Sequence, residues 1–127
     1  MIEEAYCSFE VAKLLREKGF DEKCYQIYDN EGYLSFNHVG YINSEKPNKD
    51  FYALAPTHQM VMAWLREVYG LSVEIFSIKG TSNVCPVFWK GNIVKLLTQD
   101  RVFNGELVDS YEEAVEAAFK YCLENLI

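Results

Sequence analysis

The chain has 127 residues, of which 50% are hydrophobic and 15% aromatic, and its formal net charge is −7. These values predict one globular domain over residues 1–127 with a packed core and exclude a disordered chain. Residues 100–127 hold seven acidic side chains against two basic ones, so we expect no direct binding to nucleic acid or to an anionic membrane.

The start of the chain, MIEE, has no basic segment followed by an apolar one, so we expect no secretory signal. No apolar run approaches the roughly 18 residues that a transmembrane helix needs. We therefore expect a cytoplasmic protein with reduced thiols. The cysteines show no C-x-x-C pair and no histidine at ligand-like spacing, so we predict no metal site and no cofactor. The four cysteines of the chain are Cys7, Cys24, Cys85 and Cys122.

The segment SFEVAKLLREKGF predicts a first helix. Ser8 is a suitable N-cap, and the apolar residues that follow recur on one helical face. Gly19 stands where a left-handed residue ends a helix. Cys7 precedes this helix and is the best-placed candidate for an activated thiol, although a buried cysteine commonly acts as a small hydrophobic residue.

Residues 23–28 and 33–37 alternate as strands on either side of the turn DNEG, which predicts a hairpin. A long irregular loop is expected at about residues 37–56. Its polar centre is flanked by apolar and aromatic side chains that should hold both arms in place, and long loops in compact domains tend to be functional. His38 and Tyr41 in this loop are candidate binding residues.

The stretch APTHQMVMAWLREVYG predicts a second helix over about residues 57–69, closed by Gly70. Its apolar stripe is Met60, Val61, Trp64, Leu65 and Val68. His58 lies in the first turn, where the positive helix end favours a neutral imidazole. That imidazole either polarises a ligand carbonyl or is an ordinary residue beside the core; both interpretations stay open, and His58 is a candidate binding residue.

Residues 71–78 predict a strand with Val73 and Ile75 on one face and Glu74 and Phe76 on the other. Residues 86–98 predict a long extended stretch with a bulge or turn at Gly91. Trp89 beside it is either a packed side chain or an exposed contact residue at a strand bend. A short strand at residues 106–110 leads to the third helix, whose capping box joins Ser110 and Glu113.

These elements follow the order α-β-β-α-β-β-β-α and predict an α+β fold, with an antiparallel sheet and three helices. The first two helices share Leu-Arg-Glu, then a glycine, then a strand (residues 15–17 and 65–67). This similarity reflects either ordinary helix–glycine–strand chemistry or two repeated α-β units in one sheet.

Signatures of established catalysis are missing from the sequence. No serine lies in a G-x-S-x-G turn, and neither a phosphate-binding loop nor a dinucleotide fingerprint occurs. We therefore predict no catalytic residue.

The segments SFEVAKLLREKGF, APTHQMVMAWLREVYG and SYEEAVEAAFKYCLENLI together resemble a family of small uncharacterised proteins from gut anaerobic bacteria and their phages and prophages. The resemblance covers roughly a third of the chain. It implies an origin in a mobile element and no particular activity.

The leading hypothesis is a non-enzymatic accessory protein that binds an unidentified protein partner, with a homodimer also possible. A second hypothesis is a small enzyme or ligand-binding protein that uses His58 or a cysteine in a pocket. A third is an acidic mimic of nucleic acid, which requires carboxylates in a regular stripe.

Overall fold

The structure is a computed structural model, and it describes residues 4–41, 49–80 and 87–127. Residue contacts group the chain into two compact units, unit 1 (Met1–Gln59) and unit 2 (Met60–Ile127). The single domain over residues 1–127 stays a prediction. The predicted α+β class is confirmed, with helices and antiparallel strands in the expected order and one additional short strand, β3.

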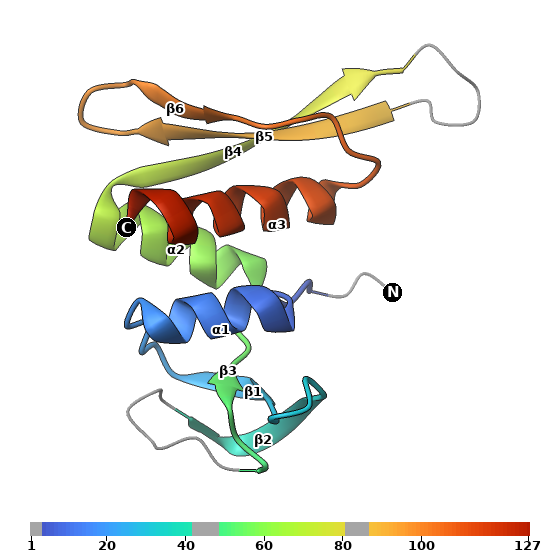
Figure 1. Ribbon diagram of the computed structural model, residues 1–127, viewed down its shortest axis with the longest axis vertical. Coiled ribbons are helices and arrows are strands. Elements are labelled where there is room, and N and C mark those ends of the chain that lie inside the picture. Colours follow the sequence, from blue (N-terminus) through green and yellow to red (C-terminus); the bar gives the residue numbers. More distant parts are fainter. Residues whose placement is uncertain (1–3, 42–48, 81–86) are drawn as a thin grey trace. The chain divides into compact units, whose positions relative to one another are not determined.

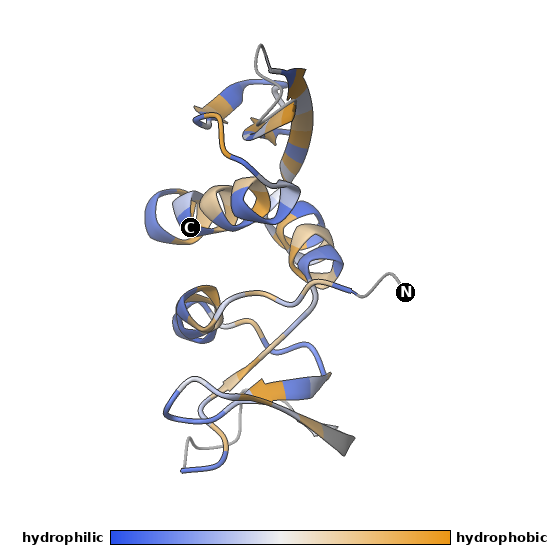
Figure 2. Cartoon of the chain, turned by 90° about the vertical axis from the view of Figure 1, so that its right-hand side faces the viewer, coloured by the Kyte–Doolittle hydropathy of each residue, from blue (hydrophilic) through white to orange (hydrophobic). Residues whose placement is uncertain are grey.

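Unit 1 has one helix over a three-stranded sheet (Figure 1). The strand order is β2-β1-β3, with both pairings antiparallel. Unit 2 has a second three-stranded sheet of order β4-β5-β6, with α3 along one face (Figures 1 and 2). The expected antiparallel sheet is therefore divided into two sheets. The elements are α1 (Phe9–Glu17), β1 (Cys24–Tyr28), β2 (Leu34–Tyr41), β3 (Ala53–Leu54), α2 (His58–Tyr69), β4 (Leu71–Lys79), β5 (Val87–Lys95), β6 (Arg101–Asn104), α3 (Tyr111–Tyr121) and η1 (Cys122–Leu126).

Helix α1 begins and ends as its sequence predicts. The Ser8 hydroxyl accepts a hydrogen bond from the Val11 N–H at 3.2 Å. At the other end, Gly19 has φ 83° and donates to the Arg16 carbonyl, while Phe20 donates to the Leu15 carbonyl at 3.0 Å. These two bonds form the Schellman motif, in which a left-handed glycine lets the last carbonyls find donors.

Helix α2 also ends at a left-handed glycine, Gly70, whose N–H donates to the Arg66 carbonyl at 3.1 Å. Val61, Trp64 and Leu65 are buried as predicted, but Val68 is exposed. The buried stripe thus ends one turn before the helix does. Met62 is buried as well, although the predicted stripe did not include it.

The similarity between the two helix–glycine–strand segments is local. The strand after α1 is the central strand of its sheet, and the strand after α2 is at the edge of the other sheet. The two segments do not share one sheet, so the interpretation as repeated units in a single sheet is wrong. Ordinary capping chemistry explains the likeness.

The predicted irregular loop at residues 37–56 is shorter than expected. Its first arm continues β2 to Tyr41, and its second arm contains β3; residues 42–48 lie outside the described residues. The second arm is held in place, as predicted: Phe51 is buried and the Tyr52 N–H donates to the Tyr28 carbonyl at 2.8 Å. Backbone pairing with β1 explains why this arm is extended.

In unit 2, Gly91 is neither a bulge nor a turn in its ladder with β4, where the register runs without a shift. A Cβ at this position would lie 3.0 Å from the Ala114 carbonyl oxygen and 3.3 Å from the Ala118 Cβ. Glycine therefore allows α3 to approach the sheet closely. The predicted strand at residues 106–110 is also wrong, because β6 comes earlier and Val108 forms only an isolated bridge with Trp89.

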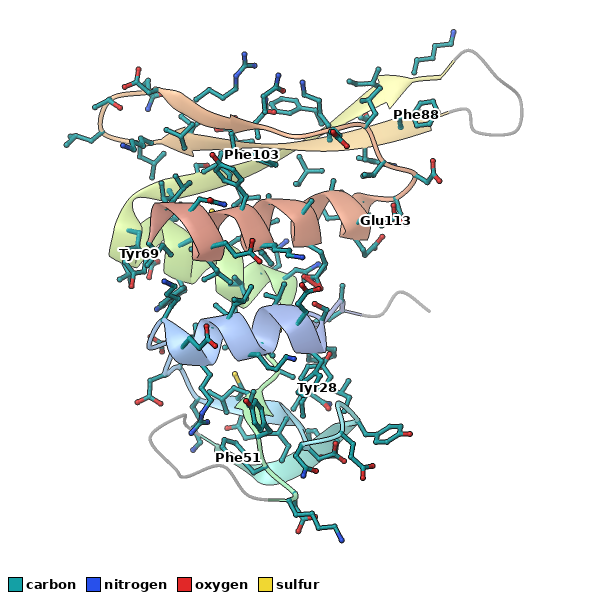
Figure 3. All side chains as sticks on the ribbon, viewed as in Figure 1. Tyr28, Phe51, Tyr69, Phe88, Phe103 and Glu113 are labelled. Carbon is teal, nitrogen blue, oxygen red and sulfur yellow. The ribbon has the colours of Figure 1, made fainter. Side chains whose placement is uncertain are left out.

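Helix α3 is confirmed with its cap, since the Ser110 hydroxyl accepts from the Glu113 N–H at 3.1 Å. Its apolar stripe is buried against the sheet of unit 2, and the helix continues into the π-helical turn η1. On the sheet, Phe103 stacks on Tyr121 with ring centroids 4.4 Å apart (Figure 3). The face of the sheet toward α3 therefore forms the core of unit 2.

Candidate binding surface

His58 begins α2 and is buried, with 5% of its surface exposed. The backbone N–H of His58 donates to the Ala5 carbonyl at 2.9 Å, and the backbone N–H of Cys7 donates to the Pro56 carbonyl at 3.0 Å. These bonds flank an antiparallel bridge between Tyr6 and Thr57. His58 and Cys7 thus occupy diagonal positions across the bridge, which are typically about 7–8 Å apart. Both side chains are buried, so a substrate does not reach this pair in the structure as it stands.

The thiols of Cys24 and Cys122 do not suit nucleophilic chemistry. Burial raises the pKa of each from 9.0 to about 12, and the Glu22 carboxylate also raises that of Cys24. Because the thiolate is the reactive form, both side chains are inert near neutral pH. Cys85 lies outside the described residues. Among the residues described, no group of three or more His, Cys, Asp or Glu side chains is placed to hold a metal ion.

His38 and Tyr41 lie in β2, where Tyr41 pairs with Cys24 of β1. Their side chains lie outside what the structure describes, and so does the centre of the predicted binding loop. The predicted binding role of these two residues therefore stays a prediction.

Trp89 lies within β5, where the ladder with β4 is regular, and not at a strand bend. It exchanges two backbone hydrogen bonds of 2.8 Å with Val108, and its ring meets the Tyr111 ring edge-on at 5.5 Å between centroids. The side chain is half-buried and belongs to the α3 side of the sheet, since side chains alternate along a strand and Gly91 faces α3. Trp89 therefore packs the start of α3 onto β5.

The opposite face of this sheet can be assigned from the same alternation. Because Gly91 faces α3, the residues one position away point outward, and so do their partners directly across on β4. We call this the outward face; it comprises Ser72, Glu74, Phe76, Ile78, Phe88, Lys90, Asn92, Val94 and Asn104. In the described part of unit 2, the only helix packed on the sheet lies on the other face.

One end of the outward face is apolar. Phe76 and Ile78 are 43% and 38% exposed, and Ile78 lies directly opposite Phe88 in the ladder. Figure 3 shows Phe88 near the end of the β4–β5 hairpin, whereas Phe103 lies toward α3. We call Phe76, Ile78 and Phe88 the hairpin patch. Its side chains come from adjacent strands and form one contiguous apolar surface.

The middle of the outward face is polar. Glu74, Asn92 and Asn104 lie directly opposite one another on the three strands, and the Lys90 ammonium donates to the Asn104 side-chain oxygen. Asn92 is only 7% exposed, and its Oδ1 has no hydrogen-bond partner among the described residues. A buried acceptor without a donor costs about 1–3 kcal/mol, which calls for an explanation.

Sequence reasoning missed the outward face although part of its signal was visible. The sequence predicts that Glu74 and Phe76 share one face and that Val73 and Ile75 share the other, and the register confirms it. The sequence did not show which of the two faces α3 covers. That depends on the contact between Gly91 and Ala114, which lie 23 positions apart in the chain.

No helix in the described part of the chain is long and apolar enough to cross a membrane. Comparison with known proteins identifies no relative: no family model matches the chain, and no curated protein or solved structure is significantly similar to it.

Proposed function

We propose that this protein is a small non-enzymatic accessory protein of the cytoplasm that acts by binding another protein. We further propose that the partner binds the outward face of the β4-β5-β6 sheet. The observation that carries the proposal is the composition of that face. An exposed apolar patch adjoins a buried amide oxygen that has no donor among the described residues.

Protein interfaces commonly combine an apolar centre, enriched in aromatic side chains, with polar groups around it. The hairpin patch supplies two phenylalanines and an isoleucine, and the neighbouring row supplies Glu74 and Asn92. A partner that offers a hydrogen-bond donor beside an apolar side chain would cover Phe76 and, once the side chains over Asn92 move aside, donate to its buried Oδ1. The inert thiols of Cys24 and Cys122 give no support to cysteine chemistry at those positions.

The resemblance of the three helical segments to proteins of gut anaerobes and their phages supports an origin in a phage or prophage. Under this proposal the partner is a protein of the bacterial host. The net charge of −7 makes nucleic acid an unfavourable partner.

The test compares variants of the hairpin patch with a matched control. Phe76→Glu and Ile78→Glu place a carboxylate on the patch, and Leu97→Glu makes the same change at a side chain that is 97% exposed in the β5–β6 turn. Proteins captured from a lysate of an anaerobic gut bacterium are identified, and the purified candidate is titrated against each variant. Circular dichroism and thermal unfolding establish that the variants are folded.

We expect a specific partner to bind the wild type and Leu97→Glu equally. Each patch variant should raise the dissociation constant roughly 30-fold or more, as for side chains at the centre of an interface. If a partner binds the patch variants as tightly as the wild type, the outward face is not the binding surface. If no protein binds while the pure chain converts a metabolite, the proposed function is wrong.

A further inference from the structure

Strand β4 is the edge strand of its sheet. Its nine residues pair with β5 on one side, and no described residue pairs with the other side. The opposite edge differs, because β6 and the Val108 bridge cover β5 there. An uncovered edge presents a row of backbone donors and acceptors to which another strand can bind.

The direction of these backbone groups follows from the hydrogen bonds of Trp89. Trp89 exchanges both of its backbone bonds with Val108, so its N–H and C=O point away from β4. Ser77, directly across from Trp89, is therefore in a non-hydrogen-bonded pair, and its own N–H and C=O point to the free edge. By the alternation of antiparallel strands, Ile75 and Lys79 present their backbone groups in the same direction.

Apart from the charge of Lys79, the outer half of β4 lacks the features that usually prevent strands from pairing at an edge. It contains no proline, and its ladder has no bulge. Residues 76–79 are all exposed, and Lys79 is the only charged residue among them. Natural edge strands are commonly protected by bulges, prolines and charged side chains, lysine above all, and here a single lysine is present. The missing protection is at the same end of the strand as the hairpin patch.

We propose that this edge binds a second copy of the chain, with the two β4 strands antiparallel about a twofold axis at Ser77. In this register Ile75 lies opposite Lys79 of the second copy, and Ser77 lies opposite Ser77. All of these residues present their backbone groups to the free edge, so the three pairs form six backbone hydrogen bonds. The two sheets then become one continuous six-stranded sheet.

The side chains of the outward face select this register over its neighbours. An axis at Ser77 places Phe76 opposite Ile78 of the second copy, so apolar side chains meet on both sides of the axis. An axis at Phe76 would place Ile78 opposite the Glu74 carboxylate of the second copy. An axis at Ile75 would place Phe76 opposite that same carboxylate. Of these three registers, only the axis at Ser77 leaves Glu74 away from apolar partners, opposite Gly80 just beyond the strand.

This inference goes beyond the proposed function, because it concerns the backbone edge of β4 and not a foreign protein on the outward face. The paired region is short, from Ile75 to Lys79, so we expect a dissociation constant on the order of micromolar. Pairing would also join the two hairpin patches into one larger apolar surface.

Sedimentation of the purified full chain over roughly 1–500 μM, a range chosen to span this affinity, tests the proposal with two variants at one position. Ser77→Pro removes an N–H that points away from β5, so the fold is expected to tolerate it. The substitution removes two central intermolecular bonds and obstructs pairing. Ser77→Ala keeps the N–H and is the matched control. We expect the wild type and Ser77→Ala to form dimers. For Ser77→Pro we expect the dissociation constant of the dimer to increase at least tenfold.

A crosslinking experiment tests the register. Ser77→Cys places two thiols opposite each other across the axis and should form an intermolecular disulfide under mild oxidation. Ser72→Cys, also on β4, should form no more intermolecular disulfide than the wild type. A wild type that stays monomeric at every concentration would overturn the proposal, as would a folded Ser77→Pro variant that dimerises normally. Preferential crosslinking through Ser72→Cys would overturn the register.

Discussion

Gly91 and Ala114 are in direct contact between sheet and helix in unit 2, where a Cβ on Gly91 would lie 3.0 Å from the Ala114 carbonyl oxygen. This contact shows which face of the sheet α3 covers. It thereby leaves Phe76, Glu74 and Asn92 on the other face, where we place the binding surface.

The first prediction concerns this contact. Gly91→Ala adds a methyl group between β5 and α3, so the helix or strand has to shift. Overpacking of this kind commonly costs about 1–3 kcal/mol. Urea unfolding should therefore show a lower free energy of unfolding for Gly91→Ala. Ser77→Ala, at an exposed position of the neighbouring strand, should change it by less than about 0.5 kcal/mol. Equal effects of the two substitutions would contradict the close approach.

The second prediction concerns the two glycines that end α1 and α2. Gly19 and Gly70 have φ of 83° and 66°, and no heavy atom outside their immediate neighbourhood lies within 4 Å of an added Cβ. Backbone strain alone should make Gly19→Ala and Gly70→Ala each cost about 1–2 kcal/mol. Asparagine tolerates this conformation better than alanine, so Gly19→Asn and Gly70→Asn should cost less in the same unfolding experiment. If alanine and asparagine cost the same, strain is not the cause.

The elements whose ends depend on local chemistry could be predicted from the sequence. Ser8 and Gly19 mark the ends of α1, and Ser110 marks the start of α3, because caps and left-handed glycines act over a few residues. The number of sheets could not be predicted in this way. Whether β1 and β4 share a sheet depends on pairing between distant segments, and both strands follow a helix and a glycine in the same manner.

The candidate site was less accessible to sequence reasoning than the fold. The sequence suggests His58 and Trp89 as candidates, but His58 is buried and Trp89 packs on Tyr111. The side chains on the outward face are ordinary residues whose importance depends on position. The alternation along β4 shows that Phe76 and Glu74 share a face, whereas the exposure of that face depends on the location of α3.

The third prediction concerns the buried thiols. In the unfolded chain Cys24 and Cys122 ionise near pH 9.0, whereas in the folded chain the pKa of each is about 12. Between these values the folded protein keeps protons that the unfolded chain has released, so the free energy of unfolding decreases as pH rises from 9 to 12. Each thiol contributes at most roughly 1.4 kcal/mol per pH unit.

Urea unfolding at several pH values between 8 and 11 measures this effect. Other groups titrate in the same range, so the wild type is compared with Cys24→Ala and Cys122→Ala, and the difference isolates each thiol. Above pH 9, we expect the free energy of unfolding to decrease less steeply with pH in each variant than in the wild type. Below pH 9, the slopes should be the same. A slope unchanged by both substitutions would show that the thiols ionise as freely in the folded protein as in the unfolded chain.

The last prediction connects stability with binding through Asn92. Its Oδ1 is buried without a donor in the described part of the chain, so Asn92→Leu removes an unsatisfied polar group at similar side-chain size. We expect the free energy of unfolding to increase by about 1 kcal/mol. If a partner supplies the missing donor, the same substitution should weaken partner binding roughly tenfold, while Leu97→Glu should change neither quantity. A loss of stability in Asn92→Leu would mean that the amide is satisfied within the protein, and it would remove the polar half of the proposed binding surface.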